Sequence, residues 1–214
     1  MSYKYNFKKK DSRRAYSLLR PFANLMIKAK YRLEYIGTEN LPEGGGYIIA
    51  ANHITALDPV IIAINTKTPL HFMAKCELFK IRIIGWLMSQ MNAFPVDRSK
   101  FDEDAINHAI DIVNNGGVLG IFPEGTRSPD FRPHKGKGGV CYIAKVCKCD
   151  VVPVSIYTSD EAKSGTKLTI RYGKPIKHEE LKFDPESMKM KDLRYATGLI
   201  MERITELWEE GHGN

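Results

Sequence analysis

Short apolar runs of strand length alternate with helix-forming segments along most of this chain, and this alternation restricts the fold more than any other feature of the sequence. The clearest run is 47–51, five apolar residues in succession, as expected of a strand buried on both faces of a sheet. Strands that alternate with helices favour a parallel sheet, because the helix provides the crossover between neighbouring strands. The sequence therefore predicts an α/β fold, a layered sandwich with a largely parallel central sheet flanked by helices.

Periodicity and Gly or Pro turns bound the expected elements. Strands are predicted at 32–36, 47–51, 71–74, 93–96, 118–122, 151–157 and 167–172. Helices are predicted at 60–65, 101–115 and 140–147. A long C-terminal helix is predicted from an apolar stripe of Leu193, Ala196, Ile200, Ile204 and Leu207.

The N-terminal residues form a separate unit, a basic amphipathic helical arm. Apolar side chains recur there at steps of three and one, at Ala15, Leu18, Leu19, Phe22, Leu25, Met26 and Ala29. Pro21 interrupts this pattern, because proline lacks an N–H and crowds the preceding turn. We therefore predict two short helices joined at residues 20–21, in an arm of residues 1–30 that precedes one domain at 31–214. Such an arm lies on a bilayer or packs on its own domain, and we favour the bilayer.

The net charge of +7 is concentrated in this arm. Residues 1–32 contain ten Lys or Arg and one acidic residue, Asp11, so the rest of the chain is slightly acidic. The arm suits an anionic surface, but a nucleic-acid-binding protein would also have a basic face on its globular part. We therefore expect an anionic membrane surface as partner and no nucleic acid. Since neither a signal peptide nor about 18 uninterrupted apolar residues occur, no spanning segment is expected.

A candidate catalytic pair follows the run 47–51, in the string Asn52-His53-Ile54-Thr55-Ala56-Leu57-Asp58-Pro59. A loop at the carboxyl end of a buried strand is where α/β proteins place their sites. Pro59 suits the start of a helix, so Asp58 is expected near a helix N-terminus, able to fold back toward His53. A carboxylate on one imidazole nitrogen leaves the other nitrogen as a base. A helix-capping Asp beside an incidental His fits the same spacing, and spacing alone does not separate the two.

Three further segments carry charged residues at strand or helix ends. Phe94-Pro95-Val96-Asp97-Arg98, taken alone, is a strand followed by an exposed ion pair. Phe122-Pro123-Glu124-Gly125-Thr126-Arg127-Ser128 is either a surface turn or a turn that presents backbone N–H groups and an arginine to an anion. Lys135-Gly136-Lys137-Gly138-Gly139 opens a helix, another place for phosphate, although it does not match the P-loop pattern. Val151-Val152-Pro153-Val154 is by itself only a strand.

In this order, the strings NHITALD, FPVDR, FPEGTRS and VVPVSI resemble the four motif blocks of glycerolipid acyltransferases, specifically the bacterial 1-acyl-glycerol-3-phosphate acyltransferases. The resemblance covers about residues 31–174. It implies that His53 is the general base and that Asp58 orients it. The residues then expected to bind substrate are Arg98, Glu124, Gly125, Thr126, Arg127, Lys137 and Pro153. Met91-Asn92-Ala93 departs from the pattern, because family members often have Gly before the second block.

The resemblance also implies a reaction. A fatty acyl group would pass from acyl-CoA or acyl-acyl-carrier-protein to the 2-hydroxyl of 1-acyl-glycerol-3-phosphate (lysophosphatidic acid), giving phosphatidic acid. No metal and no dissociable cofactor are expected, and the protein would lie peripherally on the cytoplasmic face of the cell membrane. Glycerol-3-phosphate or a lysophospholipid as acceptor fits the same motifs, and a non-enzymatic module that binds anionic lipid or nucleic acid is a further alternative. The apolar cluster 78–88 fits an acyl-chain site, a lipid contact or ordinary core.

Overall fold

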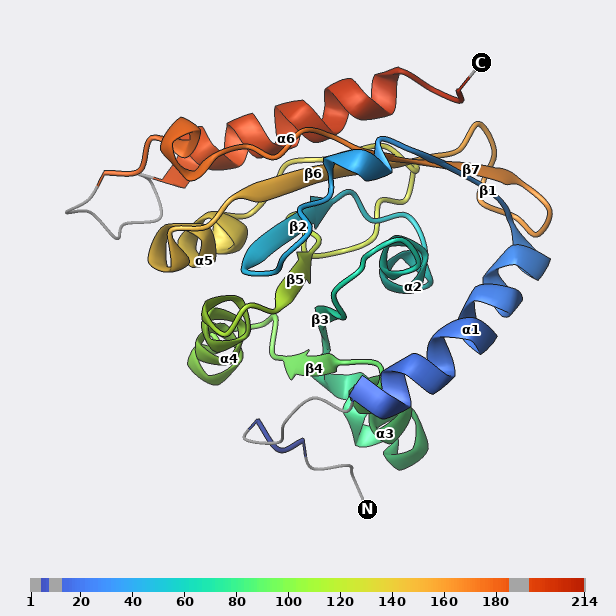
Figure 1. Cartoon of the computed structure of the whole chain (residues 1–214), viewed down its shortest axis with the longest axis horizontal. Coiled ribbons are helices and arrows are strands. Elements are labelled where there is room, and N and C mark those ends of the chain that lie inside the picture. Colours follow the sequence, from blue (N-terminus) through green and yellow to red (C-terminus); the bar gives the residue numbers. More distant parts are fainter. Residues whose placement is uncertain (1–4, 8–12, 185–192, 214) are drawn as a thin grey trace.

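The computed structural model describes residues 5–7, 13–184 and 193–213. Its centre is a seven-stranded sheet in the order β1-β7-β6-β2-β5-β3-β4 (Figure 1). The strands are β1 (Arg32–Ile36), β2 (Tyr47–Ala51), β3 (Leu70–Lys75), β4 (Ala93–Val96), β5 (Val118–Ile121), β6 (Val151–Tyr157) and β7 (Lys167–Tyr172). Strands β2 to β6 run parallel to one another, while β7 is antiparallel to β6 and parallel to β1. The predicted α/β fold with a largely parallel sheet is confirmed.

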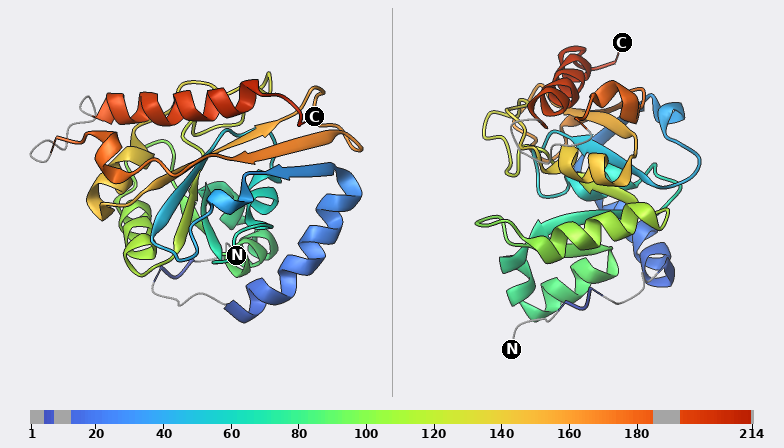
Figure 2. Two further views of the ribbon diagram at one scale, coloured as in Figure 1. Left: turned by 45° about the horizontal axis from the view of Figure 1, so that its top comes forward. Right: turned by 90° about the vertical axis from the view of Figure 1, so that its left-hand side faces the viewer.

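Helices cover both faces of the sheet and make a three-layer sandwich. The helices α4 (Glu103–Asn114), α5 (Gly139–Cys147) and α6 (Arg194–Glu209) share one core with the sheet. On the opposite face lie α1 (Arg13–Lys30) and α2 (Asp58–Ala63). Figure 2 shows α6 and α1 on opposite sides of the strands. The remaining helical segments are α3 (Arg82–Gln90) and the 3₁₀ turns η1 (Thr38–Asn40), η2 (Cys76–Lys80) and η3 (His178–Leu181).

The middle strand β2 supplies side chains to both layers. Ile48 and Ala50 belong to the core under α4 to α6, whereas Ile49 and Ala51 belong to the core under α2. Because successive side chains of a strand point to opposite faces, a strand covered on both sides is apolar throughout. All five of its residues are buried, as the unbroken apolar run predicted.

The N-terminal arm differs from the prediction of two short helices joined at residues 20–21. It forms one helix, α1, with Pro21 inside it. An interior proline costs about 3 kcal/mol, because it removes a hydrogen bond and crowds the preceding turn. Tyr16 before the proline and Ile27 after it are both buried against the domain, and this packing offsets the cost. A helix cap at Asp11 or Ser12, which the sequence also allows, lies outside the described residues, as do Lys4, Lys8, Lys9 and Lys10.

The face of α1 that packs on the domain is not the apolar stripe seen in the sequence. Leu18, Phe22, Leu25 and Met26 of that stripe have exposed fractions between 57% and 77%. One face of the helix therefore packs on the domain, while most of the stripe faces away from it. Among the described residues, no helix combines the length and the apolarity needed to cross a bilayer.

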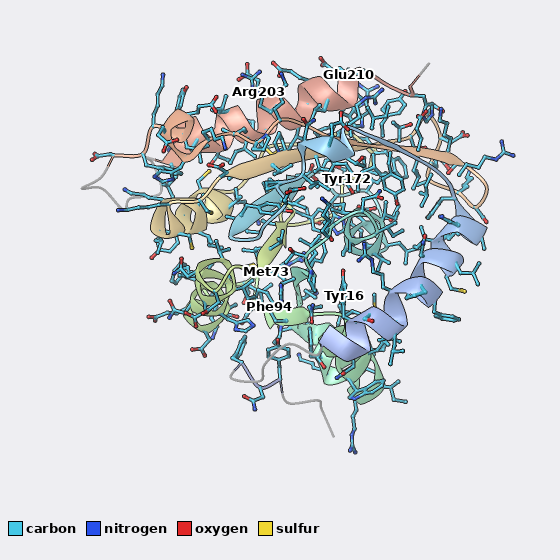
Figure 3. The ribbon with its side chains drawn as sticks, viewed as in Figure 1. Tyr16, Met73, Phe94, Tyr172, Arg203 and Glu210 are labelled. Carbon is cyan, nitrogen blue, oxygen red and sulfur yellow. The ribbon has the colours of Figure 1, made fainter. Side chains whose placement is uncertain are left out.

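The last described residues are bound to the edge of the sheet formed by β1 and β7. Arg171 Nε lies 2.9 Å from Glu210 Oε2. Figure 3 shows Glu210 at the C-terminal end of α6. The Thr169 hydroxyl donates to Glu34 Oε2 at 2.7 Å and lies 2.9 Å from His212 Nδ1. Burial lowers the pKa of His212 below its ordinary value. This polar network holds the C-terminal residues 210–213 against the strand that follows α1.

Candidate active site

The two most specific motif strings follow neighbouring strands. β2 ends at Ala51 and leads into the loop of His53 and Asp58, while β5 ends at Ile121 and leads into the turn 122–128. Because β2 and β5 are parallel, both loops leave the sheet at the same edge. A hydrogen bond of 2.7 Å from the Ser128 N–H to the His53 carbonyl oxygen joins the two loops.

Asp58 is fully buried at the start of α2, and hydrogen-bond donors surround its carboxylate. Oδ2 lies 2.7 Å from His53 Nδ1 and accepts the backbone N–H groups of Ile54 at 2.6 Å and Thr55 at 2.9 Å. Oδ1 accepts the Thr55 hydroxyl at 2.6 Å. These bonds fix the orientation of the carboxylate. The predicted return of Asp58 toward His53, from the start of a helix, is confirmed.

Aromatic stacking holds the flat face of the His53 ring. The ring centroids of His53 and Phe122 are 4.1 Å apart with an interplanar angle of 18°, and Phe122 stacks in turn near Phe72 at 5.7 Å. An ionised carboxylate only accepts hydrogen bonds, so in the neutral imidazole Nδ1 of His53 carries the proton toward Asp58 and Nε2 has the free lone pair. The His53 side chain is 12% exposed, which leaves little of the ring in contact with solvent.

Glu124 is buried under the turn 122–128 and shapes it. Its Oε1 accepts the His134 N–H at 3.2 Å, and its Oε2 lies 3.2 Å from the Ser128 hydroxyl. Burial raises the pKa of Glu124 above its ordinary value, because the charged form loses solvation. Both oxygens have partners within the protein, which favours a part in holding the turn over direct contact with a substrate.

Three cations, Arg98, Lys100 and Lys137, line a cavity of about 400 Å³ beside Phe122, together with the carboxylates of Asp97 and Asp102. Arg98, which follows β4, donates from Nη1 to the Gly125 carbonyl oxygen at 2.7 Å, and Lys137 also lines the cavity. Gly125 has a φ of +74°, and a Cβ atom there would lie 3.1 Å from Lys137 Nζ. The backbone conformation therefore favours glycine, and a Cβ would also press on the Lys137 ammonium. An arginine and a lysine at one cavity are suited to a phosphate group.

Three residues of the predicted set lie elsewhere. Thr126 and Arg127 are exposed on the turn, and neither is among the described residues that line this cavity. Pro153 is buried in β6, where its carbonyl oxygen accepts the Gly173 N–H at 2.8 Å. The structure thus brings together His53, Asp58, Arg98, Glu124, Gly125 and Lys137.

Similarity to known proteins identifies the family of this chain. The sequence model of the acyltransferase family matches residues 32–157, more than half of the chain. The chain belongs to the acyltransferase family. The resemblance inferred from the four motif strings is confirmed.

This acyltransferase is similar to curated 1-acyl-sn-glycerol-3-phosphate acyltransferases. It is 31% identical over 173 residues to that of Bacillus subtilis, covering 79% of this chain and 84% of the relative. It is 33% identical over 190 residues to that of Streptococcus pneumoniae, covering 84% of this chain and 70% of the relative. The crystal structure of the 1-acyl-sn-glycerophosphate (LPA) acyltransferase PlsC from Thermotoga maritima has the same fold, with a TM-score of 0.71, 24% identity and coverage of 97% and 86%.

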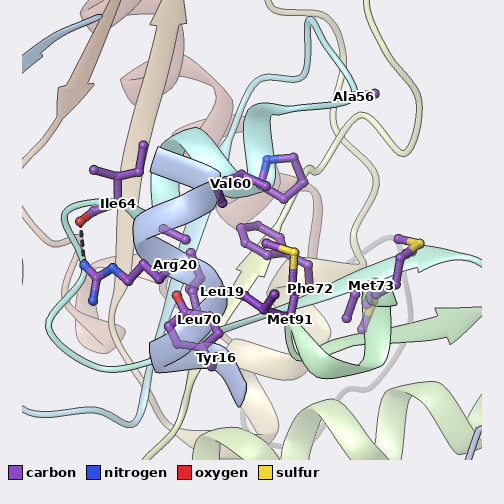
Figure 4. Close-up of a pocket in the computed structure, with 16 residues that line it drawn as sticks. Tyr16, Leu19, Arg20, Ala56, Val60, Ile64, Leu70, Phe72, Met73 and Met91 are labelled. Atoms are coloured by element: carbon purple, nitrogen blue, oxygen red, sulfur yellow. Dashed lines mark hydrogen bonds between the residues drawn. The ribbon is translucent and has the colours of Figure 1, made fainter. Parts of the chain in front are cut away.

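The acyltransferase has a second cavity, of about 220 Å³, on the face of the sheet that carries α1 and α2 (Figure 4). Its wall is largely apolar and includes Tyr16 and Leu19 of α1, Val60 of α2 and Phe72 of β3. Ala56 and Pro59, from the segment that contains the His53–Asp58 pair, also line it. Met73 lines both cavities, so the apolar cavity and the cationic cavity lie on either side of one side chain.

Three residues that build the site were not singled out from the sequence. Thr55 binds the Asp58 carboxylate, and Phe122 supports the His53 ring. The Asn52 side chain donates to the Ile156 carbonyl at 3.0 Å and accepts the Ile156 N–H at 2.7 Å, so it extends the pairing of β2 with β6. In the sequence, Asn52 is visible as a polar residue directly after an apolar run. Its role could not be predicted, because its partner Ile156 lies 104 positions away.

Proposed function

We propose that this acyltransferase transfers a fatty acyl group from an acyl thioester to the 2-hydroxyl of 1-acyl-glycerol-3-phosphate, giving phosphatidic acid in phospholipid biosynthesis. The observation that carries this proposal is the pair of His53 and the buried Asp58, with Nδ1 and Oδ2 at 2.7 Å, beside a cavity whose lining includes Arg98 and Lys137. A base next to several cations suits an acceptor that carries both a hydroxyl and a phosphate. The names of the curated relatives from Bacillus subtilis and Streptococcus pneumoniae agree with this choice.

In the proposed reaction, Nε2 of His53 takes the proton of the acceptor hydroxyl while its oxygen attacks the thioester carbonyl carbon. The tetrahedral intermediate then expels the thiolate as the C–S bond breaks, and His53 returns the proton to the sulfur. Asp58 stabilises the imidazolium that forms between these steps. A positioned base of this kind contributes about 10²–10⁴-fold to the rate. The acceptor oxygen itself is the nucleophile, so the reaction needs no Ser or Cys nucleophile. In this proposal it also uses no metal and no dissociable cofactor.

Arg98 and Lys137 bind the acceptor phosphate in this proposal. Arginine offers several N–H donors in a planar fork, and lysine supplies a compact positive charge. The acyl chain of the donor is assigned to the apolar cavity between α1, α2 and β3, because this cavity reaches the loop of His53 and Asp58 at Ala56 and Pro59. The donor is acyl-CoA or acyl-acyl-carrier-protein, since both present the same thioester.

The protein would work peripherally on the cytoplasmic face of the cell membrane. The exposed apolar stripe of α1 and the absence of any acidic residue in that helix support this location. Anionic lipids of the cytoplasmic leaflet attract basic segments, and apolar side chains add a burial term. Phe22→Asp should weaken binding to anionic vesicles, whereas Lys135→Ala, at an exposed position of the loop before α5, should have little effect.

The decisive experiment is mass spectrometry of the products formed from lysophosphatidic acid and a panel of acyl thioesters by the purified protein and by His53→Ala. Phosphatidic acid should form with the wild-type protein and fall by at least about tenfold in the variant. Parallel reactions with glycerol-3-phosphate and with a lysophospholipid test the acceptor. Faster acylation of either compound would show that this compound, and not lysophosphatidic acid, is the preferred acceptor.

A further inference from the structure

Helix α3 is unusual because most of its large apolar side chains are exposed, while Met88 is half-buried. Ile83 is 78% exposed, Trp86 53% and Leu87 41%. The buried residues of this helix are Gly85 and Gln90, a glycine and a polar residue. Ile81, just before the helix, is 55% exposed. A cluster of large apolar side chains on the surface marks a contact with another apolar phase.

The exposed face of α3 lies near α1. Figure 1 shows α3 beside the N-terminal end of α1 at one corner of the molecule. Both helices help to line the apolar cavity, α1 through Tyr16 and Leu19, and α3 through Met88. The exposed stripe of α1 and the exposed face of α3 therefore flank the same cavity.

The charges around these helices favour an anionic partner. The sequence of α1 contains Arg and Lys but no acidic residue. Lys80 and Arg82 lie at the start of α3, while Glu77 of the same segment is paired with Lys75 at 3.3 Å. An apolar centre bordered by cations, with a tryptophan in it, matches the boundary between headgroups and acyl chains of an anionic bilayer.

We propose that α3 is a second membrane-insertion element, which enters the surface of an anionic bilayer together with α1 through Ile83, Trp86 and Leu87. This inference rests on the peripheral membrane location proposed above. Two contacts on either side of the cavity fix the orientation of the protein, whereas one helix alone would allow rotation about its axis. The cavity between α1 and α3 then faces lipid.

Tryptophan fluorescence tests this directly, because Trp86 and Trp208 are the two tryptophans of the chain. In Trp208→Phe, Trp86 is the only reporter. Its emission should shift to shorter wavelength on vesicles of phosphatidylglycerol and phosphatidylcholine, and lipids with a quencher on the acyl chain should reduce it. In the matched variant Trp86→Phe, Trp208 on α6 should show neither effect. Circular dichroism checks that both variants are folded.

A second pair of variants tests the contribution of α3 to binding. Ile83→Asp should lower the affinity for these vesicles by about tenfold or more, since a carboxylate replaces an inserted apolar group and is repelled by the lipid charge. Tyr195→Asp on α6 changes a residue that is also 52% exposed and should bind like the wild type. Each variant should keep its turnover on short-chain, water-soluble substrates, which separates membrane contact from the proposed reaction.

The outcomes are distinct. A Trp86 signal that stays unchanged while the protein co-sediments with vesicles would assign the contact to α1 alone and overturn the inference. The same conclusion would follow if Ile83→Asp and Tyr195→Asp bound equally well. If the wild-type protein did not bind the vesicles at all, the membrane location would fail together with the inference. Turnover of soluble substrates would then still decide the proposed reaction.

Discussion

The Arg98 guanidinium donates a hydrogen bond of 2.7 Å to the carbonyl oxygen of Gly125, although the two residues lie 27 positions apart. Arg98 follows β4 and Gly125 follows β5, and β3 separates these strands in the sheet. The guanidinium therefore reaches across β3 and closes one side of the cationic cavity. A guanidinium has five N–H groups, so this bond leaves others able to meet a phosphate.

Arg98→Ala should impair use of the phosphorylated acceptor more than Arg127→Ala does, because Arg98 lines the cavity and Arg127 is exposed outside it. Loss of a charge-assisted hydrogen bond costs about 1.5–3 kcal/mol, or roughly 10- to 150-fold in acceptor KM. Steady-state kinetics with the acceptor and the thioester varied in turn measure this. A raised KM for the donor alone would assign Arg98 to the phosphates of the donor. A larger acceptor effect for Arg127→Ala would place the phosphate outside the cavity.

Gly125→Ala should raise the acceptor KM, because the new Cβ would lie 3.1 Å from Lys137 Nζ as well as strain a backbone with φ of +74°. Gly165→Ala is the matched control. Its φ is +87°, but no atom lies within 4 Å of the position that a Cβ would take. Both variants should lose about 1 kcal/mol or more of stability from the backbone alone. Equal acceptor KM values in the two variants would show that Lys137 does not need the space at Gly125.

Asp58→Asn should lower kcat strongly and also lower the melting temperature. The carboxylate accepts from His53, Ile54 and Thr55, and an amide group would turn an N–H toward some of these donors. His53→Ala should lower kcat to a similar extent with less loss of stability, since the His53 side chain is partly exposed whereas the Asp58 carboxylate is fully buried. Thermal unfolding and kcat measured on the same samples separate these effects. Turnover of Asp58→Asn close to that of the wild type would leave Asp58 as a helix cap.

Arg20→Ala should destabilise the protein although Arg20 belongs to the basic arm. Its Nη2 atom donates to the carbonyl oxygens of Ile64 and of Thr66, at 2.9 Å for Thr66, next to the end of α2. Arginine at a helix C-terminus satisfies carbonyl groups that have no partner within the helix. The free energy of unfolding should fall by about 1.5–3 kcal/mol. Lys28→Ala, at an exposed position of the same helix, should change it by less than about 0.5 kcal/mol. Equal stability of the two variants in urea would contradict this capping.

Acid should loosen the network that binds the C-terminal residues. The Thr169 hydroxyl, assisted by Lys167, lowers the pKa of Glu34 from 4.5 to about 2. Since the unfolded chain then binds the proton more readily, Glu34 contributes stability above pH 4.5 and loses this contribution as the pH falls toward 2. The pKa of His212 is also lowered in the folded protein, so protonation of His212 likewise reduces stability as the pH falls below 6.5. Urea unfolding at several pH values should show a smaller loss of unfolding free energy below pH 4.5 for Glu34→Gln than for the wild type. Identical losses in the two proteins would show that Glu34 does not cause this loss of stability.

The sheet and the candidate pair of His53 and Asp58 could be predicted from the sequence because their signals are local. Strand β2 is apolar throughout because it is covered on both faces, and Pro59 after Asp58 marks the start of a helix. Helix α3 was not predicted as such. Its apolar residues 81–88 lie mostly at the surface, so their pattern does not mark a buried face.

Tertiary structure decided the features that depend on distant partners. Residues 13–30 form one helix through Pro21 because Tyr16 and Ile27 pack on the domain on both sides of it. The sequence by itself determined the α/β fold and the family, and it allowed the return of Asp58 toward His53 without separating it from a helix cap. Only the three-dimensional arrangement decided that the apolar stripe of α1 faces outward and that Arg98, not Arg127, lines the cavity. The periodicity of a segment describes its faces but not what covers them, and the reach of a side chain depends on which strands become neighbours.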